Sequence, residues 1–185
     1  IDELGKLGIL SIAATSNFEV NVDANGDIPT SCESPYLITV TNSHRDGSKA
    51  TGKEWKTISQ PSFANLGAGF GSTHIDIAAP GDEILSTAVR TSSDESQFYT
   101  AQSGTSFSTP HVAGAIGYLH SVAPWTFNSR YYSNPAAAAL ELKEVLLDTV
   151  TPVEAMQGLT QSAGVLNLFE ASQALQVRSL FYVNN

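Results

Sequence analysis

Cysteine is nearly absent from this chain of 185 residues, in which Cys32 stands alone. A single thiol excludes an internal disulfide and a structural zinc site built from clustered cysteines. Basic residues are scarce too, since nine Lys and Arg face eighteen Asp and Glu, for a formal net charge of −9. Nucleic acids and anionic membranes attract clusters of Lys and Arg, so this charge argues against both as partners.

Long hydrophobic runs are also missing. No stretch approaches the roughly 18 consecutive apolar residues of a membrane span, and the chain does not open with the basic and then apolar pattern of a signal peptide. It opens at Ile1, inside a helix-like pattern with Leu4 and Leu7, and we expect this start to be a cut end. With 42% hydrophobic residues, the chain suits one globular domain with a sizeable core.

Short apolar runs and helical spacing alternate along the chain. Runs rich in β-branched residues predict strands at residues 8–14, 36–40, 75–79, 84–89 and 98–102. Apolar residues at helical spacing predict helices directly after Ser106, over residues 135–149 and near residues 167–175. The sequence of residues 179–183 is typical of a strand. This order indicates an α/β fold.

Ser106 lies in a Gly-Thr-Ser turn that opens the first long helix, which is rich in small residues. A helix N-terminus presents unpaired N–H groups and positive potential, which would stabilise an anion forming beside the hydroxyl. Most Ser residues that precede helices only cap them, and this is the plainer interpretation of Ser106 taken alone.

The run at residues 104–114, GTSFSTPHVAG, closely resembles the nucleophile motif of the subtilases, the subtilisin-like serine peptidases. Phe107 and Ser108 occupy the two variable positions of that motif, and the rest matches. Segments at residues 62–67, 75–81 and 164–167 resemble further subtilase segments in the same order. The resemblance therefore covers nearly the whole chain and implies that Ser106 is the nucleophile.

Subtilases also supply an oxyanion donor from an Asn side chain just after a strand, in a segment similar to Ala-Ala-Gly-Asn. Asn17 keeps this position, although Thr15 and Ser16 depart from the usual small residues. The resemblance implies that Asn17 is catalytic together with Ser106, and that Ala14, Thr15 and Ser16 contribute to substrate binding. Without Ser106, Asn17 would be read as a turn residue.

The loop after the oxyanion Asn helps to form the primary specificity pocket of subtilases, and Asp27 lies in this loop. The resemblance implies that Asp27 binds substrate and favours a basic side chain. A solvated loop carboxylate is the plainer alternative. The Ile28–Pro29 bond resembles a cis peptide position of the family.

The histidine and aspartate of the triad are absent. In subtilases the order is Asp, His, Ser, and the His lies in a His-Gly-Thr-His motif that this chain lacks. We expect His111 to hydrogen bond within its helix and His44 to pair with Asp46 in a surface loop. Without a general base, the chain alone should be inactive. We expect the triad Asp and His in an N-terminal part of the same catalytic domain, continuous with this chain or separate from it.

The resemblance implies a three-layer α/β fold, a mostly parallel sheet with helices on both faces that is incomplete at its N-terminal side. Residues 1–178 would be the C-terminal part of the catalytic domain, and residues 179–185 an added edge strand or the start of a further segment. It also implies a secreted or periplasmic endopeptidase that cleaves polypeptides through an acyl-enzyme. No cofactor is required, and structural calcium is compatible with the family.

Three other interpretations were weighed. An α/β-hydrolase elbow needs Gly-x-Ser-x-Gly, but Ser108 occupies the last glycine position. The glycines at residues 67–71 resemble a dinucleotide loop, but Ser72 replaces its final glycine. The third is a non-catalytic subtilase-like domain that binds peptides or partners and has lost its base. The presence of both Ser106 and Asn17 argues against it.

Overall fold

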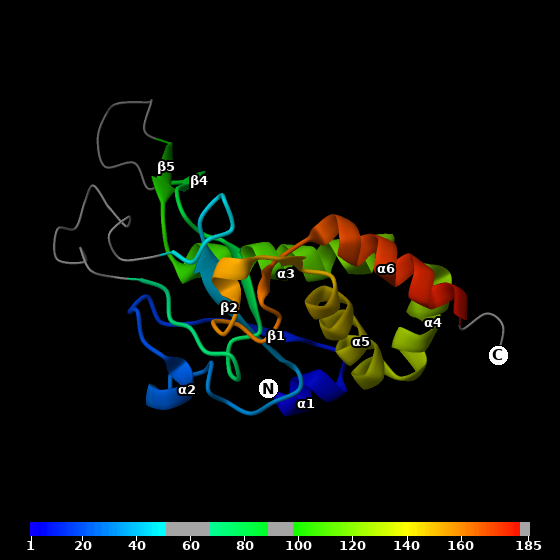
Figure 1. The fold of residues 1–185 in the computed structure, drawn as a ribbon. Coiled ribbons are helices and arrows are strands. Elements are labelled where there is room, and N and C mark those ends of the chain that lie inside the picture. Colours follow the sequence, from blue (N-terminus) through cyan, green and yellow to red (C-terminus); the bar gives the residue numbers. More distant parts are fainter. Residues whose placement is uncertain (51–66, 89–97, 182–185) are drawn as a thin grey trace.

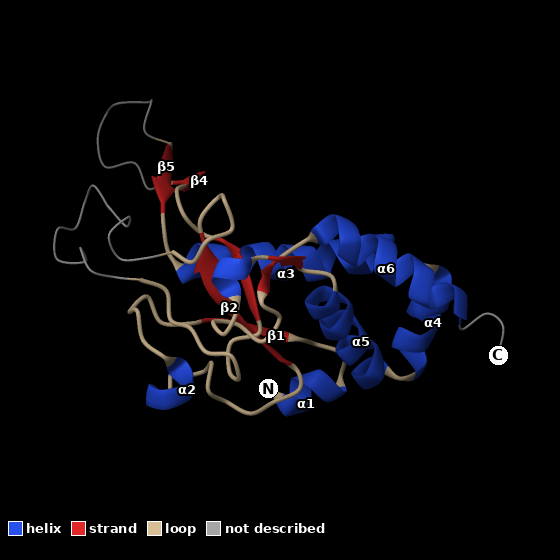
Figure 2. Ribbon diagram, in the orientation of Figure 1, coloured by secondary structure: helices blue, strands red, loops and turns tan. Residues whose placement is uncertain are grey.

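The computed structural model describes residues 1–50, 67–88 and 98–181. Within these ranges five strands form one sheet, in the order β1-β2-β3-β7-β6. Their bounds are β1 (Ser11–Ala14), β2 (Leu37–Ser43), β3 (Ile77–Pro80), β7 (Gly164–Val165) and β6 (Thr151–Pro152). All adjacent pairs are parallel except β6 with β7. The mainly parallel α/β architecture expected from the sequence is confirmed (Figures 1 and 2).

Strand β2 is buried along its whole length, as expected of a central parallel strand. On one face, Ile38 and Val40 join the main hydrophobic core with helices α3 (Thr105–Val122), α5 (Pro135–Asp148) and α6 (Leu168–Phe181). On the other face, the Thr41 hydroxyl donates to the carbonyl of Gly69 at 2.7 Å. The short helix α2 (Val22–Asn25) lies beyond Gly69 and buries Val22 against it. Helices α3, α5 and α6 therefore pack on one face of the sheet, and the four-residue helix α2 lies on the side of Gly69.

Helix α3, which carries the candidate nucleophile Ser106 in its first turn, packs against the sheet. Its buried residues Val112, Ala115, Ile116 and Leu119 recur at helical spacing and pack in the main core. Pro110 lies in the early part of the helix, five residues after Thr105. The helix predicted after Ser106 is confirmed.

Helix α5 also agrees with the sequence. Asn134 caps it by accepting a hydrogen bond from the Ala137 N–H at 3.3 Å, and Pro135 occupies the first turn. The remaining elements are α1 (Asp2–Lys6), α4 (Trp125–Ser133) and the 3-10 turn η3 (Glu154–Met156). The sequence did not predict α2 or α4. Each of them buries one large apolar residue, so neither has an amphipathic repeat to recognise.

A small two-stranded antiparallel sheet precedes the turn that carries Ser106. It consists of β4 (Ile84–Thr87) and β5 (Tyr99–Gln102), with Ile84 opposite Gln102. It projects from the main body beside the carboxyl ends of β2 and β3 (Figure 1). These strands confirm the two short ones predicted there. Residues 62–66 of the subtilase-like segment fall outside the described ranges.

Of the two alternatives for residues 179–185, the added edge strand is wrong where the structure describes it, because helix α6 continues to Phe181. Leu175 and Ser179 are buried one turn apart, and the Ser179 hydroxyl donates to the Leu175 carbonyl at 2.9 Å. Packing against the core therefore overrides the strand preference of these side chains. Helix α6 also runs through the boundary placed at residue 178.

Candidate active site

Ser106 lies in the first turn of α3 and is exposed. The N-cap residue is Gly104, with φ 154° and ψ 158°, a region essentially restricted to glycine, and it makes no side-chain cap. Ser106 therefore does not serve as the helix cap. Among the residues that the structure describes, none forms a hydrogen bond with the Ser106 hydroxyl.

The turn before Ser106 is packed tightly against the carboxyl ends of β2 and β3. The Gly104 N–H donates to the Gly81 carbonyl at 2.8 Å, and the Ser108 hydroxyl donates to Asn42 Oδ1 at 3.3 Å. A Cβ atom on Gly81 would lie 2.0 Å from Ser108 Oγ and 2.7 Å from the Gly104 carbonyl oxygen. Only glycine fits here, and its absent side chain lets the nucleophile helix approach the sheet.

The Asn17 side chain is held beside this turn. Its Oδ1 accepts hydrogen bonds from the Thr105 N–H at 3.0 Å and from the Thr105 hydroxyl at 2.9 Å. A backbone N–H can only donate, so the amide oxygen must face Thr105 and the amide Nδ2 must face away from it. The fold thus brings Asn17 to the two residues that precede Ser106 and leaves its N–H groups available to a ligand.

The backbone that carries Asn17 is tied to three other segments. The Thr15 N–H donates to the Val40 carbonyl at 3.0 Å and continues the sheet one residue past β1. The one hydrogen of the Thr105 hydroxyl is shared between Asn17 Oδ1 and the Thr15 carbonyl, which lies 2.6 Å from the hydroxyl oxygen. The Ser16 carbonyl accepts from the Gly69 N–H at 2.8 Å. This segment is therefore rigidly placed. Thr105, which the sequence did not single out, organises it from the nucleophile motif.

Asp27, in the loop at residues 26–31, contacts the same segment, residues 15–17. Its Oδ2 accepts from the Ser16 N–H at 2.8 Å, the Thr30 hydroxyl at 2.7 Å and the Thr15 hydroxyl at 3.3 Å. Asp27 is half-buried, so the solvated loop carboxylate is not what the structure shows. The Ile28–Pro29 bond is cis, as the resemblance implied.

Two of the four histidines were given partners from the sequence. His111 Nδ1 lies 2.8 Å from the Phe107 carbonyl oxygen, one helical turn earlier, which confirms a bond within the helix. His44 was expected to pair with Asp46. Hydrogen bonds lower the pKa of the Asp46 carboxyl most and the charge of His44 helps to lower it, but the hydrogen bond of the His44 ring goes to Asp82. His44 Nδ1 lies 2.8 Å from Asp82 Oδ2, because β2 and β3 are neighbours and both residues follow their carboxyl ends.

The other two histidines lie elsewhere in the fold. His120 packs edge-on against the Tyr131 ring, with centroids 5.0 Å apart, and burial lowers the pKa of its imidazole. His74 Nδ1 lies 2.9 Å from Asp23 Oδ1. Burial by itself would raise the pKa of Asp23, but hydrogen bonds from the His74 side chain and backbone lower it overall. No histidine of this chain is hydrogen bonded to Ser106 within the described ranges.

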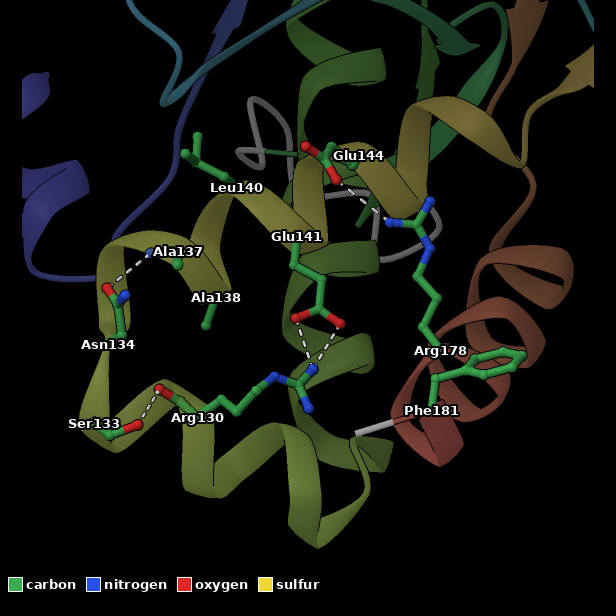
Figure 3. A pocket seen from close by; sticks show the side chains of 10 residues that line it. All are labelled: Arg130, Ser133, Asn134, Ala137, Ala138, Leu140, Glu141, Glu144, Arg178 and Phe181. Carbon is green, nitrogen blue, oxygen red and sulfur yellow. Dashed lines mark hydrogen bonds and ion pairs between the residues drawn. The ribbon is translucent and has the colours of Figure 1, made fainter. Parts of the chain in front are cut away.

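A hollow of about 650 Å³ lies apart from these residues, between α4, α5 and α6 (Figure 3). Arg130 donates to both carboxylate oxygens of Glu141 at 2.7 Å, and Arg178 faces Glu144 at 3.4 Å. Its charged side chains therefore neutralise one another. They offer no arrangement of nucleophile and base.

No three or more His, Cys, Asp or Glu side chains of the described residues are grouped so that they could hold a metal ion. Structural calcium stays a prediction. In the described ranges no helix combines the length and the apolar character that crossing a membrane requires.

Curated relatives and solved structures resemble this chain. An extracellular protease of Xanthomonas campestris pv. campestris is 35% identical over 118 residues, which are 63% of this chain and 17% of that protein. Alkaline protease 1 of Aspergillus oryzae is 31% identical over 138 residues, which are 75% of this chain and 27% of that protein. The chain thus spans about a quarter or less of the length of these two proteases.

A solved structure agrees on the fold. A chain from the structure of the subtilase cytotoxin assembly superposes with a TM-score of 0.67 at 22% identity, covering 99% of this chain and 55% of that one. The sequence model of the Subtilase family matches residues 1–169. Because that match spans most of the sequence, the chain belongs to the subtilase family.

Proposed function

We propose that this chain supplies the nucleophile and an oxyanion donor of a serine endopeptidase. Ser106 Oγ attacks the carbonyl carbon of a peptide bond, and its proton passes to a base. The carbonyl oxygen becomes an oxyanion that accepts a hydrogen bond from Asn17 Nδ2. Collapse of this intermediate expels the amine and leaves an acyl-enzyme on Ser106, which water then hydrolyses.

The observation that carries this proposal is the fixed orientation of the Asn17 amide. An oxyanion donor is effective when it is already aimed before the charge develops, because no reorganisation is then needed during the reaction. Thr105 imposes that orientation because its backbone N–H, which can only donate, lies 3.0 Å from Asn17 Oδ1. A residue that only shaped a turn would not need its amide oxygen directed to Thr105 and its amide nitrogen directed away from it.

The base and its orienting carboxylate are proposed to come from an N-terminal part of the same catalytic domain, as a continuous or a separate chain. The exposed side of α3 supports this. Ser106, Pro110, Gly114 and Gly117 are all exposed and recur along one side of the helix. A Cβ atom on Gly114 or Gly117 would meet nothing within 4 Å among its neighbours. Small residues on a helix allow close approach by another element, and here that element is proposed to carry the triad His.

The proposed substrate is a polypeptide whose backbone lies along Ala14, Thr15 and Ser16, next to Asn17. The proposed location is outside the cell or in the periplasm. In support, the relative from Xanthomonas campestris pv. campestris bears the name extracellular protease.

The proposal is tested with a fluorophosphonate probe on the full-length protein. Covalent labelling requires an activated serine hydroxyl, and peptide mass spectrometry should place the label on Ser106. A Ser106→Ala variant is the matched control and should remain unlabelled. A non-catalytic peptide- or partner-binding domain would leave the wild type unlabelled as well, and that outcome would refute the proposal.

A further inference from the structure

We infer that Asp27 is a positioning residue for the oxyanion donor: its carboxylate holds the backbone that presents Asn17. This inference rests on the proposed function. It differs from a specificity role, in which the carboxylate would bind a basic substrate side chain.

The Ser16 N–H, just past the end of β1, needs an acceptor outside the sheet. The strand ends at Ala14, and the Thr15 N–H makes the last hydrogen bond to β2, at 3.0 Å from the Val40 carbonyl oxygen. The Ser16 N–H lies beyond this ladder and needs another acceptor. Asp27 Oδ2 provides it at 2.8 Å, a charged acceptor on the residue directly before Asn17.

The carboxylate is itself held in place. The Thr30 hydroxyl donates to Asp27 Oδ2 at 2.7 Å, and the Asp27 N–H donates to the Ser31 hydroxyl at 2.7 Å. Asp27 and Thr30 are buried or half-buried. The loop at residues 26–31 therefore acts as a fixed support from which the carboxylate reaches the oxyanion segment.

The same segment is held from its other side by the nucleophile motif. The Thr105 N–H donates to Asn17 Oδ1 at 3.0 Å, and the Thr105 hydroxyl shares its one hydrogen between the Thr15 carbonyl at 2.6 Å and Asn17 Oδ1 at 2.9 Å. Asp27 and Thr105 thus fix Thr15, Ser16 and Asn17 from two directions. Releasing Ser16 would let Asn17 shift relative to Ser106, and a misplacement of about 1 Å can cost roughly 100-fold in rate.

One oxygen of Asp27 receives all three donors from its surroundings, at 2.7, 2.8 and 3.3 Å. An asparagine can present one amide oxygen in the same place, so a positioning role does not need the negative charge. Recognition of a basic side chain does need it. This difference separates the two roles by experiment.

The test compares Asp27→Ala and Asp27→Asn in the full-length protein, by the rate of fluorophosphonate labelling and by kcat and KM on peptides with Arg or Phe before the scissile bond. Asp27→Ala should slow labelling and lower kcat roughly 10- to 100-fold, equally for both peptides. Asp27→Asn should recover most of that loss on both peptides. If Asp27→Ala does not fold, Asp27→Glu replaces it, because its longer side chain displaces the carboxylate and should slow both peptides alike.

Asp23→Ala is the matched control. Asp23 is a carboxylate near the same loop that accepts hydrogen bonds from the Thr73 and His74 backbone at 3.1 and 2.9 Å, but not from residues 15–17. It should lower stability without changing the labelling rate. Equal slowing by Asp23→Ala, unchanged labelling in the Asp27 variants, or a loss confined to the Arg peptide in Asp27→Asn would each overturn the inference. A wild type that labels normally keeps the proposed function in all three cases, whereas an unlabelled wild type overturns that function first.

Discussion

Asn17 Oδ1 and the backbone N–H of Thr105 form a 3.0 Å hydrogen bond between residues 88 positions apart in the sequence. The Thr105 hydroxyl lies 2.9 Å from the same oxygen and shares its one hydrogen between this oxygen and the Thr15 carbonyl. Because Ser106 follows Thr105 directly, this pair holds Asn17, the proposed oxyanion donor, next to Ser106, the proposed nucleophile.

Removal of the Asn17 side-chain amide should weaken stabilisation of the transition state more than it weakens substrate binding. Asn17→Ala in the full-length protein should lower kcat by about 10²–10³ with little change in KM, the loss known for the corresponding donor of subtilisin. Asn17→Asp is the sharper variant, because its carboxylate can still accept from Thr105 but cannot donate to an oxyanion. Steady-state kinetics should show both variants equally impaired, and an Asn17→Asp enzyme with normal kcat would contradict this role.

Loss of the Thr105 hydroxyl should loosen the segment at residues 15–17, which carries the proposed oxyanion donor Asn17. Thr105→Val keeps the shape of the side chain and its N–H bond to Asn17, but leaves the Thr15 carbonyl without its donor at 2.6 Å. We expect the free energy of unfolding to fall by about 1 kcal/mol and kcat to fall with it. Urea denaturation and kinetics check this, and Thr105→Ser, which keeps the hydroxyl, should behave like the wild type.

A side chain at Gly81 should not be tolerated. The Cβ of Gly81→Ala would lie 2.0 Å from Ser108 Oγ and 2.6 Å from Asn42 Oδ1, both in a closely packed region. Overpacking of this kind costs about 1–3 kcal/mol or more, and it would push the nucleophile helix off the sheet. Thermal unfolding should show a clear loss of stability together with loss of labelling. An unchanged melting temperature would mean that α3 is not seated as described.

A larger side chain at Gly117, on the exposed side of α3, should change stability in opposite directions depending on whether another part of the protein covers that side. If Gly117 faces solvent in the full-length protein, Gly117→Leu should stabilise it by roughly 0.5–1 kcal/mol through helix propensity. If an N-terminal part of the domain covers this side, the added side chain should destabilise the protein and reduce activity. We expect the second result in denaturant unfolding. Gln173→Leu, on the exposed side of α6, should be nearly neutral.

His120 should make stability depend on pH. Burial lowers the pKa of its imidazole, so the folded protein favours the neutral form. As pH falls below the ordinary value of about 6.5, the unfolded chain takes up the proton first and the folded state loses stability. Replacement by Phe, which keeps a ring beside Tyr131, should remove this component. The difference in unfolding free energy between His120→Phe and wild type should therefore grow from pH 7 to pH 5, and a constant difference would exclude it.

Local pattern was sufficient for most elements of the fold. The predicted strand at residues 36–40 overlaps β2 from Leu37 on, and the helix predicted over residues 135–149 matches α5. Both agree because β-branched runs and helical spacing report directly on buried faces. Residues 179–181 failed because their strand-like composition is outweighed by packing around Leu175. The hydrogen bond of His44 to Asp82 was not predicted, because these two residues become neighbours only when β2 pairs with β3.

The sequence by itself determined the family, the nucleophile motif around Ser106 and the candidacy of Asn17, since residue identity and order along the chain are enough to recognise them. Only the tertiary structure decided how Asn17 is oriented and what Asp27 touches. Both depend on hydrogen bonds between segments that are distant in sequence, and their partners are fixed by sheet pairing and helix packing. No local pattern encodes the direction in which an amide or a carboxylate points.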